Sequence, residues 1–245
     1  MSWMFPRSSG IHAPETREWI LGALYLPVFL FFLNIAILAY FPALGFPLTE
    51  PRNYFFANLL YMAVNFAVML LIFRRTLWQS LREFEGKMLL SVLIGFGMCY
   101  GANLVLTTAY TVLDIMPENY NQEAVNSLLG GYPLAMTLCT VVLAPLAEEC
   151  LFRGVLFAPL ARRCLPAAYA LSMFLFAGMH VFQFLGSMTA ANTILCLSLY
   201  LPASFSLCWV YQKTGNIWAG IFLHMFINFQ SVLASLLRSL MQAFL

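Results

Sequence analysis

The chain has 245 residues, of which 62% are hydrophobic and only 9% are charged, and its formal net charge is +2. A soluble domain carries roughly 25% charged residues, so this composition excludes a protein whose whole surface faces water. The lack of a basic patch gives no indication of a nucleic-acid partner. Alternating hydrophobicity is absent, which argues against an outer-membrane barrel and favours an all-α, polytopic transmembrane helical bundle.

Apolar runs close to the ~20 residues that a bilayer requires predict about seven spans, with six and eight as alternatives because the last run can split or end early. The first run is long and no small-residue cleavage site follows it, so we expect it to be retained. Residues 1–245 are expected to form one integral membrane domain, because neither a repeat nor a soluble stretch interrupts them. The predicted spans are Trp19–Phe41, Tyr54–Phe73, Met88–Leu113, Tyr132–Leu160, Leu165–Leu185, Ala190–Tyr211 and Ile217–Leu240.

The segment RRTLWQSLREFEGK separates the second and third predicted spans. Its large apolar residues fall on one helical stripe, and its charged residues lie elsewhere. This pattern predicts a short interfacial helix on the cytoplasmic face. The residues of the stripe are Leu77, Trp78, Leu81 and Phe84.

The distribution of lysine and arginine predicts the orientation. One side of the membrane receives only Arg52 and Arg238, whereas the side of the N-terminus receives nine basic residues. Cytoplasmic loops carry the excess of basic residues, so we expect a cell (inner) membrane protein with a cytoplasmic N-terminus. The acidic loop 114–131, which has no base, is expected outside. The nine residues are Arg7, Arg17, Arg74, Arg75, Arg82, Lys87, Arg162, Arg163 and Lys213.

Three ionisable residues lie within six positions of the fourth predicted span: Glu148, Glu149 and Arg153. An ionisable group inside the membrane costs several kcal/mol and marks a candidate functional site. Adjacent residues point about 100° apart on a helix, so the two glutamates have different tasks. The i, i+4 spacing allows Glu149 to pair with Arg153, which leaves Glu148 free to face a cavity.

Two later spans add polar groups to this set. His180 lies in the fifth predicted span, and the i, i+4 spacing places His224 and Asn228 on one face of the last. Taken singly, each residue has a structural explanation as an interhelical hydrogen-bond partner. Together with a glutamate they supply the groups that peptide-bond hydrolysis needs. A carboxylate and an imidazole activate water and protonate the leaving amine, and a second imidazole and an amide stabilise an oxyanion.

Three alternatives stay open at this point. His180, His224 and Glu148 could bind a divalent metal such as zinc, although the helical motif HExxH is absent. Serine proteolysis is less favoured, because no GxSxG-like element lies near the histidines. A non-enzymatic transporter or bacteriocin-immunity protein would also use intramembrane Glu, Arg and His.

The polar motifs resemble those of the CAAX protease and bacteriocin-processing enzyme family, also called the Abi family. EECLFR (Glu148–Arg153) is similar to its EExxxR motif, FAGMH (Phe176–His180) to FxxxH and HMFIN (His224–Asn228) to HxxxN. All three occur in the family's order on apolar spans, within the C-terminal half. We expect residues 132–240 to be the catalytic half.

The resemblance implies a glutamate-dependent intramembrane endopeptidase that acts on a membrane protein or peptide precursor. We expect no cofactor, with zinc as the alternative. Eukaryotic members, which act on prenylated proteins, typically have another span after HxxxN, so bacterial roles such as peptide maturation are favoured here. Glu148 with His180 would activate the water, His224 with Asn228 would form the oxyanion hole, and Glu149, Arg153 and Phe176 would support them.

Overall fold

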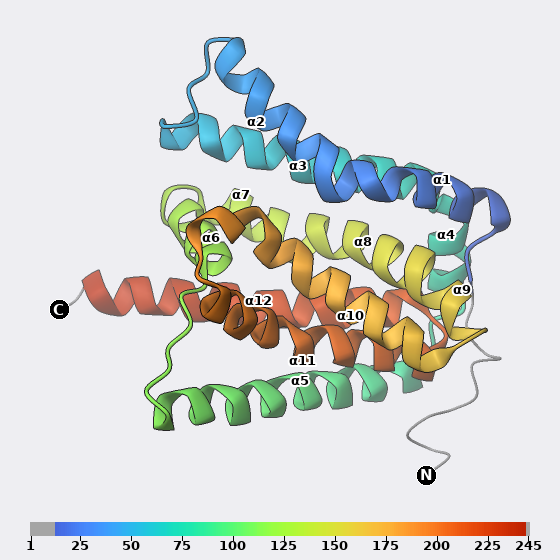
Figure 1. Cartoon of the computed structure of the whole chain (residues 1–245). Helices are drawn as coiled ribbons and strands as arrows, with labels where there is room; N and C mark the ends of the chain where they lie inside the picture. The colour runs from blue at the N-terminus through green and yellow to red at the C-terminus, as the bar shows by residue number, and fades with distance from the viewer. Residues whose placement is uncertain (1–12, 244–245) are drawn as a thin grey trace.

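The computed structural model describes residues 13–243, and every regular element in this range is a helix (Figure 1). In chain order these are α1 (Thr16–Pro27), η2 (Val28–Phe32), α2 (Leu33–Ala43), α3 (Pro51–Ile72), α4 (Arg74–Arg82), α5 (Lys87–Val112), α6 (Tyr120–Gly131), α7 (Pro133–Leu138), η3 (Cys139–Leu143), α8 (Ala144–Glu149), η4 (Cys150–Phe157), α9 (Ala158–Ala161), α10 (Leu165–Val181), η5 (Phe182–Ser187), α11 (Ala190–Thr214) and α12 (Ile217–Ala243). The segments η2, η3 and η4 are π-helical, and η5 is a 3-10 helix.

Seven helical segments in the described range are long and apolar enough to cross a membrane. They confirm the predicted all-α bundle, and each predicted run agrees with one segment to within three residues at either end. The segments are Thr16–Ala43, Pro51–Ile72, Lys87–Val112, Pro133–Ala161, Leu165–Ser187, Ala190–Thr214 and Ile217–Gln242.

The fourth span, Pro133–Ala161, lies at the centre of the bundle. Half of its apolar window is buried inside the protein, against 17% for the first and third spans. Pro145 does not break this span, although a proline lacks an N–H and clashes with the carbonyl four residues before it. The wider π-helical turn of η3 ends just before α8, where Pro145 occupies the first turn, so the chain passes the proline without a gap.

A helix does form between the second and third spans, as predicted, but its packing differs from the predicted stripe. In α4, Leu77 is buried whereas Trp78 is 62% exposed and points away from the core. The inner face also buries Ser80, whose hydroxyl accepts from the backbone N–H of Ile217 at 3.1 Å. Polar bonds to the start of α12 therefore position α4, and the apolar stripe is divided between the core and the surface.

The predicted loop 114–131 contains a helix, α6, which the sequence analysis did not predict. The Asn119 side chain accepts a hydrogen bond from the Gln122 backbone and so caps its N-terminus. Ser231 and Ser235 of α12 donate to Gln122 and Asn126, at 3.2 and 2.8 Å. Short polar side chains thus hold α6 against the last span.

Most basic residues of the described range gather at one end of the bundle, and Arg7 lies outside that range. Figure 1 shows the start of α1, α4 and the end of α9 at this end, with α6 and the C-terminal part of α12 at the other. Arg17, Arg74 and Arg162 lie in or directly beside these elements. The predicted grouping of positive charge therefore agrees with the fold, while the side of the membrane that this end faces stays a prediction.

Candidate active site

Glu149 and Arg153 form a buried ion pair at the end of α8 and in η4. Arg153 Nη1 lies 3.0 Å from Glu149 Oε1, and both residues are 0% exposed. Arg153 Nη2 also donates to the backbone oxygen of Ser204 in α11, at 3.3 Å. This geometry confirms the pairing predicted from the i, i+4 spacing, and it ties the fourth span to the sixth.

His224 lies between the two glutamates, a contact that the sequence analysis did not predict. Its Nδ1 is 2.9 Å from Glu149 Oε1, and its Nε2 is 3.7 Å from Glu148 Oε2. The first distance is a hydrogen bond, and the second is too long for one. Glu148 is 8% exposed, and its Oε2 has no hydrogen-bond partner in the described protein. The two neighbouring carboxylates therefore have different surroundings, as their predicted separate tasks require.

Gly220 allows the close approach of α12 to the glutamates. It precedes His224 by four residues, so the two lie on the same face of the helix. A Cβ at Gly220 would lie 3.0 Å from Glu149 Oε2, which is closer than most real Cβ contacts. Because Gly220 has no side chain, α12 can come close enough to the fourth span for His224 to lie beside both carboxylates.

His180 contacts the backbone of its own helix rather than Glu148, and its predicted part in activating water stays a prediction. Its Nδ1 is 2.8 Å from the carbonyl oxygen of Phe176, and no hydrogen bond or ion pair joins it to Glu148 within residues 13–243. A carbonyl oxygen only accepts, so Nδ1 carries the proton and Nε2 presents a lone pair in the neutral ring. The imidazole stacks on Tyr200 of α11, with ring centroids 4.4 Å apart.

The aromatic ring of Phe176 links the three motifs. The rings of His180 and His224 lie 4.9 and 5.5 Å from it, centroid to centroid. The guanidinium carbon of Arg153 lies 4.7 Å from the same centroid, within the range of a cation–π contact. The phenylalanine of the FxxxH motif thus contacts the other two motifs directly.

Asn228 follows His224 by one helical turn and donates from Nδ2 to the carbonyl oxygen of Thr140, at 2.8 Å. Thr140 belongs to the π-helical segment η3, just before the glutamates. The predicted neighbours His224 and Asn228 therefore both contact the fourth span. One hydrogen of the Asn228 amide is used by this bond, and the other is available to a ligand.

The sequence analysis missed Tyr200, which supports His180 from α11. The Tyr200 hydroxyl donates to Asn119 at 3.0 Å and accepts from Asn121 at 3.2 Å, which connects it to the start of α6. A tyrosine in an apolar run gives no signal of such a role on its own. A buried tyrosine hydroxyl needs a hydrogen-bond partner, and this need is the one property that could have indicated a role for Tyr200.

The alternative metal ligands Glu148, His180 and His224 are not brought together. Within residues 13–243, no group of three His, Cys, Asp or Glu side chains has the spacing to hold a metal ion. The contacts of His224 are to two carboxylates, and those of His180 are to a carbonyl oxygen and an aromatic ring. The residues therefore do not fit a three-ligand centre in this arrangement, and the predicted lack of a cofactor stays a prediction.

Two comparisons with known proteins agree with the motifs. Residues 130–230 match a family model described as type II CAAX prenyl endopeptidase Rce1-like. A Bacillus subtilis (strain 168) protein, "Putative membrane peptidase YdiL", is 27% identical over 186 residues, which cover 72% of each chain. No solved structure matches. These findings agree with the family recognised from the three motifs: residues 130–230 of this seven-span integral membrane protein are similar to the Rce1-like CAAX endopeptidases.

Proposed function

We propose that this protein is an intramembrane endopeptidase that hydrolyses a peptide bond with Glu148 as the general base. The observation that carries the proposal is the contrast between the two adjacent buried carboxylates. Oε2 of both glutamates lacks a hydrogen-bond partner in the described protein, but Oε1 of Glu149 is held by Arg153 and His224, and no such hydrogen bond reaches Glu148. A buried acceptor of this kind suits the binding and deprotonation of a water molecule.

Glu149 is unsuited to the same task. Its Oε1 accepts from both Arg153 and His224, at 3.0 and 2.9 Å, and such charge-assisted bonds stabilise the ionised carboxylate. Oε1 of Glu149 is therefore already engaged by protein donors. We therefore assign Glu149 and Arg153 to support, and we expect them to position the imidazole of His224.

His180 is proposed to exchange protons with the attacking water and the leaving amine. With Nδ1 bonded to the Phe176 carbonyl, Nε2 is the nitrogen that can accept a proton and later release it. The stack on Tyr200 restrains the ring without using either nitrogen. Direct contact with Glu148 is not required, because one water molecule can connect a base to the atom it serves.

His224 and Asn228 are proposed to stabilise the oxyanion of the tetrahedral intermediate. His224 Nδ1 is engaged by Glu149, so its Nε2 donates only when the ring is an imidazolium. The second amide hydrogen of Asn228 would supply the other donor.

The substrate class follows from the location of the site. The glutamates lie in a buried, membrane-spanning segment, so the substrate is proposed to be a membrane-associated protein or peptide precursor. The name of the matched family model points to a CAAX-type cleavage, which we carry over as the reaction class.

Comparison of peptide termini in membranes tests the proposal. Cells that produce the wild-type protein, Glu148→Gln or Glu123→Gln would be compared by mass spectrometry of membrane-protein termini. Glu123 is an exposed carboxylate on α6 and serves as the matched control. We expect new termini with the wild type and the control, and none with Glu148→Gln. Identical termini in all three, or in cells without the protein, would contradict the proposal and favour a non-enzymatic role.

A further inference from the structure

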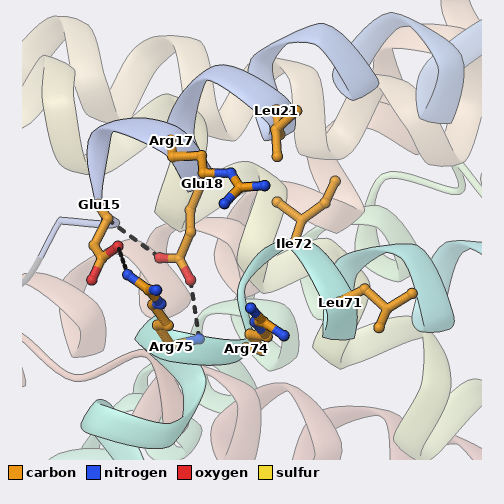
Figure 2. Close-up of a pocket in the computed structure, with 8 residues that line it drawn as sticks. All are labelled: Glu15, Arg17, Glu18, Leu21, Leu71, Ile72, Arg74 and Arg75. Atoms are coloured by element: carbon orange, nitrogen blue, oxygen red, sulfur yellow. Dashed lines mark hydrogen bonds and ion pairs between the residues drawn. The ribbon is translucent and has the colours of Figure 1, made fainter.

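A groove of about 350 Å³ lies outside the candidate active site, between the first turn of α1 and the junction of α3 with α4 (Figure 2). Its lining combines charged residues with apolar ones. The charged residues are Glu15, Arg17, Glu18, Arg74 and Arg75, and the apolar residues are Leu21, Leu71 and Ile72.

Both carboxylates of the groove are already engaged by the protein. Glu15 forms an ion pair with Arg75 at 3.0 Å. Glu18 is buried and accepts from the backbone N–H groups of Arg75 and Thr76, at 3.0 and 3.2 Å, and from the Thr76 hydroxyl. It thereby satisfies the first amides of α4, which would otherwise lack partners. Neither acid is available to neutralise a further cation in the groove.

Arg17 and Arg74 remain as exposed cations. Within the described chain, neither guanidinium has an ion pair. Figure 2 shows Arg17 on α1 and Arg74 at the start of α4 on two sides of the groove, with Ile72 beside them. Two guanidinium groups facing one space form a site for an anion, since each can donate two parallel hydrogen bonds to a phosphate.

The groove lies at the same end of two membrane-spanning segments. Arg17 is the second residue of the first spanning segment, and Arg74 comes two residues after the end of the second. Leu21 is one turn further into the membrane on the same face as Arg17, and it is 40% exposed. Leu71 is one turn before Arg74 and 70% exposed. Cations thus lie at the boundary, with apolar side chains directly below them.

We propose that this groove binds an anionic glycerophospholipid, with its phosphate between Arg17 and Arg74 and an acyl chain against Leu21 and Leu71. The apolar residues Leu21 and Leu71 favour a lipid over a free phosphate ion, because only a lipid has an acyl chain that can pack against them. The bound lipid bridges α1 and α4. It therefore stabilises the folded protein by mass action, as any ligand of the native state does.

The test measures lipid binding to the purified full chain in a neutral detergent. Phosphatidylglycerol and phosphatidylcholine are titrated, with native mass spectrometry to count bound lipid and thermal unfolding to follow stability. The Arg17→Gln/Arg74→Gln variant is compared with Arg82→Gln/Arg163→Gln, which removes two exposed arginines elsewhere at the same end of the bundle. A double Arg→Lys variant at positions 17 and 74 keeps the charge.

We expect the wild type and the control to bind phosphatidylglycerol in preference to phosphatidylcholine and to gain thermal stability from it. The Arg17→Gln/Arg74→Gln variant should bind it about 30-fold more weakly, since each arginine near a membrane surface contributes on the order of 1 kcal/mol. The Lys variant should retain most of the binding. If the double Gln variant does not fold, Arg74→Gln alone should weaken binding about fivefold.

Three results would overturn the proposal. The first is equal binding of the two lipids by the wild type. The second is an equal loss in the Arg82→Gln/Arg163→Gln control, which would show that only total charge matters. The third is displacement of the lipid by millimolar glycerol 3-phosphate, or an equal stabilisation by that soluble compound, which would show that a free phosphate ester is the ligand.

Discussion

Substitution of Arg153 by methionine should destabilise the protein through Glu149. The guanidinium and the carboxylate are 3.0 Å apart and fully buried, so the substitution leaves a charge in the core with His224 as its remaining partner. Removing one member of a buried pair costs about 3–5 kcal/mol. A change of 1 kcal/mol shifts the Tm of a chain this long by about 2–4 °C, so the Tm should fall by about 6–20 °C.

The assay is thermal unfolding of the purified protein in detergent, together with cleavage activity and folded yield. The Glu149→Gln/Arg153→Met double variant is the critical comparison, because it removes both charges of the pair together. We expect its Tm to lie between those of the wild type and Arg153→Met. An unchanged Tm in Arg153→Met together with lost activity would refute this reasoning and assign Arg153 a direct part in catalysis.

Three further predictions concern packing, positioning and metal. Gly220→Ala should lower the free energy of unfolding by about 1–3 kcal/mol because its Cβ meets Glu149, whereas Gly97→Ala, which has open space around it, should not; equal Tm values would contradict this. Tyr200→Ala should lower kcat about 2- to 10-fold through loss of the stack on His180, and Tyr200→Phe should lower it less; the reverse order would assign the role to the hydroxyl. Activity should survive chelation, and its loss with restoration by zinc would favour the alternative metal site.

The spans and the buried pair could be predicted because they depend on local pattern. An apolar run of spanning length gives a helix wherever it occurs, and the i, i+4 spacing brings Glu149 and Arg153 together within one helix. The order and placement of the three motifs were sufficient to identify the family region, which residues 130–230 then confirmed.

The contacts of His224 could not be predicted, because they join residues 75 positions apart. They depend on how closely α12 packs against α8. Gly220 allows this close packing because it has no Cβ. The stack of His180 on Tyr200 is likewise set by the packing of α10 on α11. In both cases, the spacing of residues along one helix does not indicate which residues of the neighbouring helix they contact.

Local irregularities were missed for a different reason. The π-helical segments η3 and η4 flank the glutamates, and a hydropathy pattern does not distinguish a wider helical turn from a regular one. Helix α6 is short and polar, so its capping residue Asn119 resembles a loop residue until the bonds from Ser231 and Ser235 are known. The predicted stripe of α4 is divided between core and surface, and the hydrogen bond that Ser80 accepts from Ile217 could not be predicted from hydrophobicity.

The most direct test of the central claim is the turnover of Glu148→Gln on a substrate identified from the membrane termini. Wild type, Glu148→Gln and Glu123→Gln would be reconstituted in vesicles at equal folded amounts, as judged by their Tm. General base catalysis contributes typically 10²–10⁴-fold, so kcat of Glu148→Gln should fall by at least about 100-fold while the control stays within about twofold. Turnover by folded Glu148→Gln at a rate near that of the wild type would contradict the account.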